Sequence, residues 1–192
     1  MHIAIEGLDG VGKTTASKEV ARRLGFEFIE KPLHYLTDSE GAENYMRITE
    51  HINDNLPADF TAMFYGLGNY YLSSELKKGK NIVTDRFLCS TYFCNCTESN
   101  RAFFDYLVGI CEKPELTVIL FSTTEVRRSR ITSRNPNDPD LKNKVLSENE
   151  YEKMFTFCER YDMPYAVIDS SALSPKQTVE RIIAEYRSRF GG

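Results

Sequence analysis

The chain has 192 residues, 41% of them hydrophobic and 27% charged, which suits a single soluble globular domain with a sizeable core. Its net charge of -4 gives no global basic field, so nucleic acid is not an expected partner. No apolar run is long enough to span a membrane, so a membrane is not an expected partner either.

The first predicted strand, over residues 2–5, leads directly into a glycine-rich segment at residues 7–14. That segment fits the pattern G-x-x-x-x-G-K-[ST] at every fixed position. Behind it, apolar residues recur on one face of a predicted helix that Gly25 can end. A glycine-rich turn between a strand and a helix N-terminus is typical of a phosphate-binding loop; a chance glycine-rich turn is the alternative.

The chemistry of this loop follows from its residue types. Glycines let backbone N–H groups curl around a polyphosphate, and the helix dipole adds to the attraction. Lys13 can reach the β- and γ-phosphates, and the Thr14 hydroxyl can ligate Mg²⁺. The residues predicted to bind the nucleotide donor are Gly7, Leu8, Asp9, Gly10, Val11, Gly12, Lys13, Thr14 and Thr15.

Further strands and helices are predicted to alternate along the rest of the chain. The strands are expected over residues 26–30, 81–85, 116–121 and 165–169. Helices are expected over residues 42–53 and 58–78 and from near Ser99 to before Pro114. Three more helices are expected to begin at capping sequences that start at Ser122, Ser147 and Ser174.

This alternation predicts an α/β fold in three layers, with a five-stranded parallel sheet flanked by helices. No linker or internal repeat divides the chain, so residues 1–192 are expected to form one domain. Ligands of such sheets bind beyond the carboxyl ends of the strands, where Glu30 and Asp85 are predicted to lie beside the loop.

The five cysteines are odd in number, and no second pair stands at zinc-binding spacing from Cys94 and Cys96. Free thiols in a reducing, cytoplasmic compartment are therefore the expectation. Residues 1–3 lead directly into a predicted strand, so we expect no signal peptide.

Asp85 and Arg86 stand at the end of the third predicted strand. A carboxylate at a strand end can hold Mg²⁺ directly or through water, and an adjacent guanidinium can clamp a second phosphate with two hydrogen bonds. A structural ion pair is the alternative. Thr14 and Asp85 are thus the predicted metal ligands, and Arg86 joins Lys13 as a predicted catalytic residue.

An arginine-rich segment follows the fourth predicted strand. Arg127, Arg130 and Arg134 are spaced i, i+3, i+7 and share one helical face. We interpret residues 125–144 as a lid whose Arg130 and Arg134 approach the transferring phosphoryl group, with a solvated basic face as the alternative. The proline- and asparagine-rich run at residues 135–140 would let such a lid move.

Together these motifs resemble the thymidylate kinase family over nearly the whole chain. The resemblance rests on residues 6–15, on residues 85–87 with Ser90, and on the arginine-rich segment. It implies a P-loop kinase fold, a homodimer, and phosphoryl transfer from Mg-ATP to a deoxynucleoside monophosphate similar to dTMP. It also implies that Asp9 meets the sugar 3′-hydroxyl and that Arg86 meets the acceptor's 5′-phosphate.

Several positions depart from that family's pattern. Gly10 stands where some members carry a catalytic arginine, so the chain resembles the members whose arginines lie in the lid. Asn69 stands where an arginine usually reads the thymine edge, and residues 94–95 are Cys-Asn rather than Tyr-Gln. Phe64 or Tyr65 would keep the aromatic wall under the base, unless both are core residues. These departures leave the identity of the base open.

The predicted acceptor-binding residues are Asp9, Glu30, Phe64, Asn69, Arg86 and Asn95. A deoxynucleoside kinase is the first alternative function, since its neutral 5′-hydroxyl acceptor would need a base, for which Glu30 is the candidate. A nucleotide-binding regulatory protein without turnover is the second. A switch GTPase is disfavoured because residues 143–146, Asn-Lys-Val-Leu, lack the Asp of an N-K-x-D guanine signature.

Overall fold

A sheet of five parallel strands, in the order β2-β3-β1-β4-β5, lies at the centre of the molecule. The computed structural model describes residues 1–138, 141 and 150–191. The strands are β1 (His2–Gly7), β2 (Glu27–Ile29), β3 (Ile82–Asp85), β4 (Leu116–Phe121) and β5 (Tyr165–Asp169). All five predicted strands are present, so the α/β class and the parallel sheet are confirmed.

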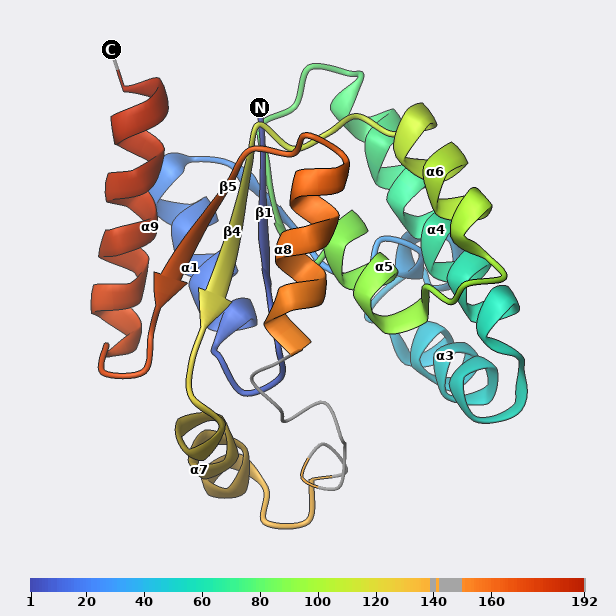
Figure 1. Cartoon of the computed structure of the whole chain (residues 1–192), viewed down its shortest axis with the longest axis horizontal. Helices are drawn as coiled ribbons and strands as arrows, with labels where there is room; N and C mark the ends of the chain where they lie inside the picture. Colours follow the sequence, from blue (N-terminus) through green and yellow to red (C-terminus); the bar gives the residue numbers. More distant parts are fainter. Residues whose placement is uncertain (139–140, 142–149, 192) are drawn as a thin grey trace.

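Helices cover both faces of this sheet. The helices of the described residues are α1 (Lys13–Leu24), α2 (His34–Thr37), α3 (Glu43–Asn55), α4 (Ala58–Leu76), α5 (Leu88–Asn95), α6 (Arg101–Ile110), α7 (Thr124–Arg134), α8 (Tyr151–Arg160) and α9 (Pro175–Phe190). Figure 1 shows α1 and α9 on one face and α5 and α8 on the other, with α4 and α6 farther out. This is the three-layer arrangement that the alternation of strands and helices predicts.

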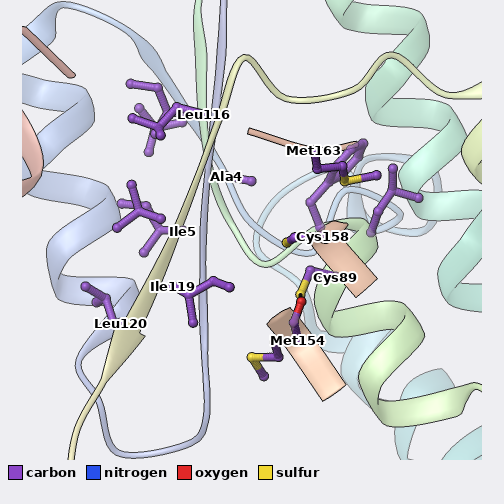
Figure 2. Close-up of a cluster of buried hydrophobic side chains, with 14 of the residues drawn as sticks. Ala4, Ile5, Cys89, Leu116, Ile119, Leu120, Met154, Cys158 and Met163 are labelled. Atoms are coloured by element: carbon purple, nitrogen blue, oxygen red, sulfur yellow. Dashed lines mark hydrogen bonds between the residues drawn. The ribbon is translucent and has the colours of Figure 1, made fainter. Parts of the chain in front are cut away.

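Strands β1 and β4 are buried on both faces of the sheet, which explains their apolar sequences. Figure 2 shows Ile5 and Leu120 on one side of the sheet and Met154 and Cys158 on the other. Successive side chains of a strand point to opposite faces. Glu6 therefore points away from Ile5, toward the face that α5 and α8 cover, where it takes part in the site described below.

The helix after β4 begins one residue later than predicted. Its N-cap is Thr123, whose side chain accepts the N–H of Val126 at 3.5 Å, rather than Ser122. Ser122 is fully buried, and its carbonyl accepts Nε of Arg127 at 3.2 Å. The predicted cap at Ser122 was wrong because Ser122, which follows β4 directly, is buried, and the side chain of Thr123 caps the helix instead.

The other capping predictions have different outcomes. The box at Ser174 is confirmed, because its side chain and that of Gln177 bond reciprocally to the backbone. The predicted cap at Ser147 lies outside the described residues. Two helices, α2 and α5, were not predicted. Among the residues described, no helix combines the length and apolar composition needed to cross a bilayer.

Candidate active site

The loop at residues 7–14 joins β1 to α1. Gly10 and Gly12 have φ values of +83° and +93°, in a backbone region that residues with a side chain rarely adopt. Gly12 is the N-cap of α1, and its carbonyl accepts the N–H of Ala16 at 3.0 Å. The loop, the first turn of α1, the end of α7 and the start of α9 line a cavity of about 460 Å³, here called the loop cavity.

Lys13 is a buried cation that lines the loop cavity. Its Nζ donates to the Leu8 carbonyl at 2.8 Å and lies 3.6 Å from Oδ1 of Asp9. Two effects lower the pKa of Lys13 to about 8: burial, which is the larger, and the nearby positive charge of Arg86. The carboxylate of Asp9 acts on the pKa of Lys13 in the opposite direction. An ammonium group that is costly to bury gains most from an anionic ligand, so the cavity suits a polyphosphate.

Asp85 lies at the end of β3, beside Ile5 of β1 in the register of the sheet. The Thr14 hydroxyl donates to Oδ2 of Asp85, whereas Oδ1 is buried without a hydrogen-bond partner among the described residues. A carboxylate oxygen left without a donor suits a divalent cation, and hydroxyl and carboxylate oxygens are ligands that Mg²⁺ accepts beside phosphate and water. The residues present therefore fit Mg²⁺ bound with a nucleotide.

Arg86 forms the turn from β3 to α5. Its φ of +69° is unusual for a residue with a side chain, and its N–H donates to the Ile5 carbonyl at 3.0 Å. The guanidinium contacts Asp9 through Nη2 and donates to Oγ of Ser90 through Nη1 at 3.2 Å. Burial alone would raise the pKa of Asp9, but Arg86 and Lys13 outweigh it and hold that pKa below its ordinary value.

Glu6 of β1 contacts the turn that carries Arg86 and the start of α5. It is fully buried, accepts the N–H of Phe87 at 2.9 Å, and accepts the hydroxyl of Ser90. Burial raises the pKa of Glu6, although these donors and Arg86 oppose the shift. Sequence reasoning did not select Glu6 as a site residue; the available signal was an acidic side chain inside an apolar strand. Its contacts tie the start of α5, and with it Arg86, to β1.

A second cavity, of about 750 Å³, lies among α3, α4, α5 and the segment after β2; we call it the helix cavity. Asp9, Asp85 and Arg86 line both cavities, so the two meet at these three charged residues. The helix cavity has the volume of a small-molecule site. Its other lining residues include Lys31, Pro32, Tyr45, Thr49, Asn53, Tyr65, Asn69, Thr91, Cys94 and Asn95.

Four of the six predicted acceptor-binding residues line the helix cavity: Asp9, Asn69, Arg86 and Asn95. Glu30 does not, and its carboxylate lies 3.7 Å from Nζ of Lys18 instead. The next residue, Lys31, lines the cavity with a φ of +46°. The corner after β2 therefore offers the cavity a cation where the sequence predicted a carboxylate.

Phe64 also lies away from the helix cavity. Its ring packs against the rings of Tyr45 and Tyr65, with centroids 6.2 Å and 5.4 Å away. Both tyrosines line the cavity, whereas Phe64 does not. Of the two aromatic candidates from the sequence, Tyr65 is thus the one in the cavity wall. Phe64 and Tyr65 are consecutive residues of one helix, and the sequence alone did not show which of the two faces the cavity.

The helix α7 packs directly on the loop. A Cβ added to Gly10 would lie 2.8 Å from the carbonyl oxygen of Arg127. Arg127 itself is fully buried, with its guanidinium 5.8 Å from the ring centroid of Tyr151. It is therefore a core residue of α7, neither part of a solvated basic face nor part of the loop cavity.

Arg130 and Arg134, the two predicted lid arginines, both line the loop cavity. Arg130 donates to the carbonyls of Val11, at 3.3 Å, and Ser170, at 2.7 Å. Arg134 pairs with Asp138 at 2.5 Å, and its side chain is 64% exposed. Arg130 is thus held against the loop, whereas the more exposed Arg134 is better placed to reach a ligand. The predicted lid over residues 125–144 continues outside the described residues.

We expect Gly10→Ala to lower the melting temperature, Tm, more than Gly12→Ala does. Both substitutions force a side chain into positive φ, at about 1–2 kcal/mol. Only the Cβ at Gly10 meets backbone, the Arg127 carbonyl; at Gly12 nothing lies within 4 Å. That overlap adds about 2 kcal/mol, or about 4–8 °C, in a domain of this size. Thermal unfolding without nucleotide is the measurement, and equal Tm values would contradict the close packing of α7 on the loop.

The fold and the site define a P-loop phosphotransferase. The family model described as thymidylate kinase matches residues 5–182, and the chain belongs to that family of nucleoside monophosphate kinases. The thymidylate kinase of Lactobacillus helveticus is 26% identical over 208 residues, covering 98% of this chain and 96% of that protein. A probable thymidylate kinase of Methanocaldococcus jannaschii is 25% identical with the same two coverages.

Among solved structures, the deoxyadenosine kinase of M. mycoides with bound dATP is similar, with a TM-score of 0.66. The match covers 97% of this chain and all of that one at 21% identity. A second structure of that enzyme, with the products dCMP and dCDP, has the same TM-score and identity. At this identity the likeness supports the fold alone.

Proposed function

We propose that the protein transfers the γ-phosphoryl group of Mg-ATP to a deoxynucleoside monophosphate, giving the diphosphate and ADP. The observation that carries this proposal is the junction of the loop cavity and the helix cavity at Asp9, Asp85 and Arg86. One cavity suits a polyphosphate, and the other has room for a nucleoside with an arginine at its phosphate end. Membership of the family supports the same reaction and makes thymidylate the first acceptor to test.

Each charged residue has a proposed role. Lys13 and the loop amides hold the β- and γ-phosphates, while Thr14 and Asp85 hold Mg²⁺, which offsets charge that develops on the transferring group. Arg86 holds the acceptor phosphate, and Asp9 meets the sugar 3′-hydroxyl while orienting Arg86. Use of ATP and the five free thiols support a cytoplasmic location.

The lining of the helix cavity favours a monophosphate over a nucleoside as acceptor. A neutral 5′-hydroxyl needs a general base, whereas a phosphate oxygen is already anionic. The described carboxylates that line this cavity are Asp9, which pairs with Arg86, and Asp85, which bonds to Thr14. Glu30, the candidate base of the alternative, pairs with Lys18 outside the lining.

The test is steady-state phosphorylation of the four deoxynucleoside monophosphates and of their parent nucleosides, with Mg-ATP as the donor. We expect turnover of at least one monophosphate and little or none of any nucleoside. Faster turnover of a nucleoside than of its monophosphate would refute the proposal. ATP binding without transfer to any acceptor would favour a regulatory role instead.

Arg134→Ala should lower kcat and kcat/KM together, by about 10²-fold or more, with little change in Tm. The reason is that a cation which engages mainly the transition state acts on the rate. Arg128→Ala is the matched control, because Arg128 is an exposed arginine of the same helix outside the loop cavity. If Arg134→Ala keeps full activity, as the control is expected to do, Arg134 does not act as a lid residue. Arg130→Ala should affect the rate and also Tm, because Arg130 holds two backbone carbonyls.

A homodimer is the proposed assembly, and α4 supplies a suitable face. Phe60, Met63, Leu67 and Tyr70 are between 46% and 56% exposed and form one stripe at i, i+3, i+7, i+10. A two-fold axis midway between positions 63 and 67 would bring Met63 of one copy against Leu67 of the other, and Phe60 against Tyr70. The stripe is therefore complementary to itself when two copies of α4 run antiparallel.

Light scattering tests this assembly. The wild-type protein is expected at twice the chain mass of 22.1 kDa, and Leu67→Glu at the mass of one chain. Val167→Glu, at an equally apolar and half-exposed position on β5, should leave the dimer intact. A monomeric wild-type protein, or a Leu67→Glu variant that remains dimeric, would exclude α4 as the interface.

A further inference from the structure

The carboxamide of Asn69 is held by a chain of hydrogen bonds that begins at the backbone of Phe87. The Thr91 hydroxyl donates to the Phe87 carbonyl at 3.1 Å, one helical turn back. Nδ2 of Asn69 in turn donates to Oγ1 of Thr91 at 2.9 Å. Asn69 is 5% exposed and Thr91 is 8% exposed, and both line the helix cavity.

These two hydrogen bonds determine which way the Asn69 amide points. A hydroxyl has one proton, and since Thr91 gives its proton to Phe87, the Thr91 oxygen can only accept from Asn69. If the amide turned over, its Oδ1 would face Oγ1 of Thr91, and one of the two hydrogen bonds would be lost. One such hydrogen bond corresponds to about a fivefold preference between the two orientations.

The orientation matters because the free edge of an amide offers one acceptor and one donor, and turning the amide over exchanges them. Thymine presents an acceptor at O4 beside the donor N3–H, whereas cytosine presents a donor at N4 beside the acceptor N3. An amide held in one orientation therefore matches one of these base edges and opposes the other.

We propose that Thr91 is a positioning residue which, by fixing the amide of Asn69, makes the enzyme discriminate between 4-oxo and 4-amino pyrimidine acceptors. This inference rests on the proposed function, which puts the acceptor base in the helix cavity. Thr91 acts through Asn69 and through its anchor on Phe87. The N–H of Phe87 donates to Glu6 of β1 at 2.9 Å. The position of the Asn69 amide is therefore fixed relative to β1 through Thr91 and Phe87.

The experiment compares kcat/KM for dTMP and dCMP, and for thymidine and deoxycytidine, in the wild-type protein and in variants. The wild-type protein should prefer one base type by about tenfold or more. Thr91→Val keeps the shape but removes the hydroxyl, and should shrink that ratio by about fivefold. Thr91→Ser retains the hydroxyl and should retain the ratio. Thr91→Ala replaces the Val variant if the latter fails to fold.

A double-mutant cycle separates positioning from general stability. In the Asn69→Ala background, Thr91→Val should leave the ratio of the two acceptors unchanged, because the amide is gone. Equal losses on both acceptors in the single variant, or a wild-type protein without base preference, would overturn the inference. Since the ratio is read on whichever acceptor form turns over, activity on nucleosides alone would refute the proposed function and still test Thr91.

Discussion

Lys13→Ala should lower kcat by about 10³-fold or more while the protein stays folded. Lys13 is a buried cation in the loop cavity, and its Nζ is held between the Leu8 carbonyl and Asp9. Charge on the phosphates shifts during transfer, and a preorganised cation in a site of low dielectric stabilises that shift strongly. Steady-state kinetics with Mg-ATP and the best acceptor is the measurement. Lys18→Ala, at an exposed lysine of the same helix, should remain active.

The stability of the Lys13→Ala variant follows from the sign of the pKa shift. The folded-state pKa of Lys13, about 8, lies below the ordinary value of 10.5, so folding disfavours its charged form. This penalty is fully present below about pH 8 and fades as pH rises toward 10.5. Near pH 7 the substitution removes the penalty and offsets the lost packing, so Tm should stay within about 3 °C of the wild-type value. A folded, fully active variant would refute the assignment of the loop.

The same titration predicts a pH profile. The free protein loses the Lys13 proton near pH 8, so kcat/KM for ATP should fall above that pH. Bound phosphates favour the charged form, so kcat should hold to higher pH than kcat/KM does. A kcat/KM profile that stays level to about pH 9.5 would show that Lys13 remains charged without ligand.

Local patterns were sufficient to predict the sheet and the loop. The strands are short apolar runs between turns, and the G-x-x-x-x-G-K-[ST] pattern is itself local in sequence. Glu6 and Asp85 show the limit of that reasoning. Both are acids at or near strand ends, yet the local sequence does not show that Asp85 contacts Thr14 or that Glu6 contacts the start of α5. Both contacts depend on which strands and helices are neighbours in the fold.

The helix α5 was missed because its sequence carries little helical signal. Leu88–Asn95 includes two cysteines, Ser90 and Thr91, which have modest helix propensity, and its apolar residues do not form one clear stripe. Tertiary contacts stabilise it instead, among them those of Glu6 with Ser90 and Phe87. Missing α5 meant missing Thr91, although Asn69 and Asn95 were selected from the sequence.

Side-chain direction was the other feature that the sequence could not predict. Glu30 directly follows β2, but its carboxylate lies 3.7 Å from Nζ of Lys18 on α1 and does not line the helix cavity. Arg127 shares a helical face with Arg130 and Arg134, yet it lies at the base of α7, where that face meets the core. Sequence spacing predicts a shared face, but only packing decides how far along the helix that face stays open.

Arg86→Lys should lower kcat/KM for the acceptor by about 10²–10³-fold, while KM for ATP changes little. The guanidinium of Arg86 contacts Asp9 and Ser90 with two different nitrogens, which sets its plane at the junction of the two cavities. A planar fork can meet a phosphate with two parallel hydrogen bonds, whereas an ammonium is a point charge. Arg128→Lys, the same change at an exposed arginine, should leave both constants unaltered.

Arg86→Gly separates the chemistry of the side chain from its place in the fold. Arg86 has a φ of +69°, so glycine relieves an unfavourable backbone conformation by about 1 kcal/mol and partly offsets the lost contacts with Asp9 and Ser90. The variant should therefore remain folded, yet turn over a monophosphate at least about 10³-fold more slowly than the wild-type protein. Added guanidinium ion at millimolar concentration should restore part of this rate in the Gly variant, which has room for it, and none in the Lys variant. If the Gly variant stays active without rescue, Arg86 is only a structural partner of Asp9, and the acceptor phosphate must be held by another cation that lines the helix cavity, such as Lys31.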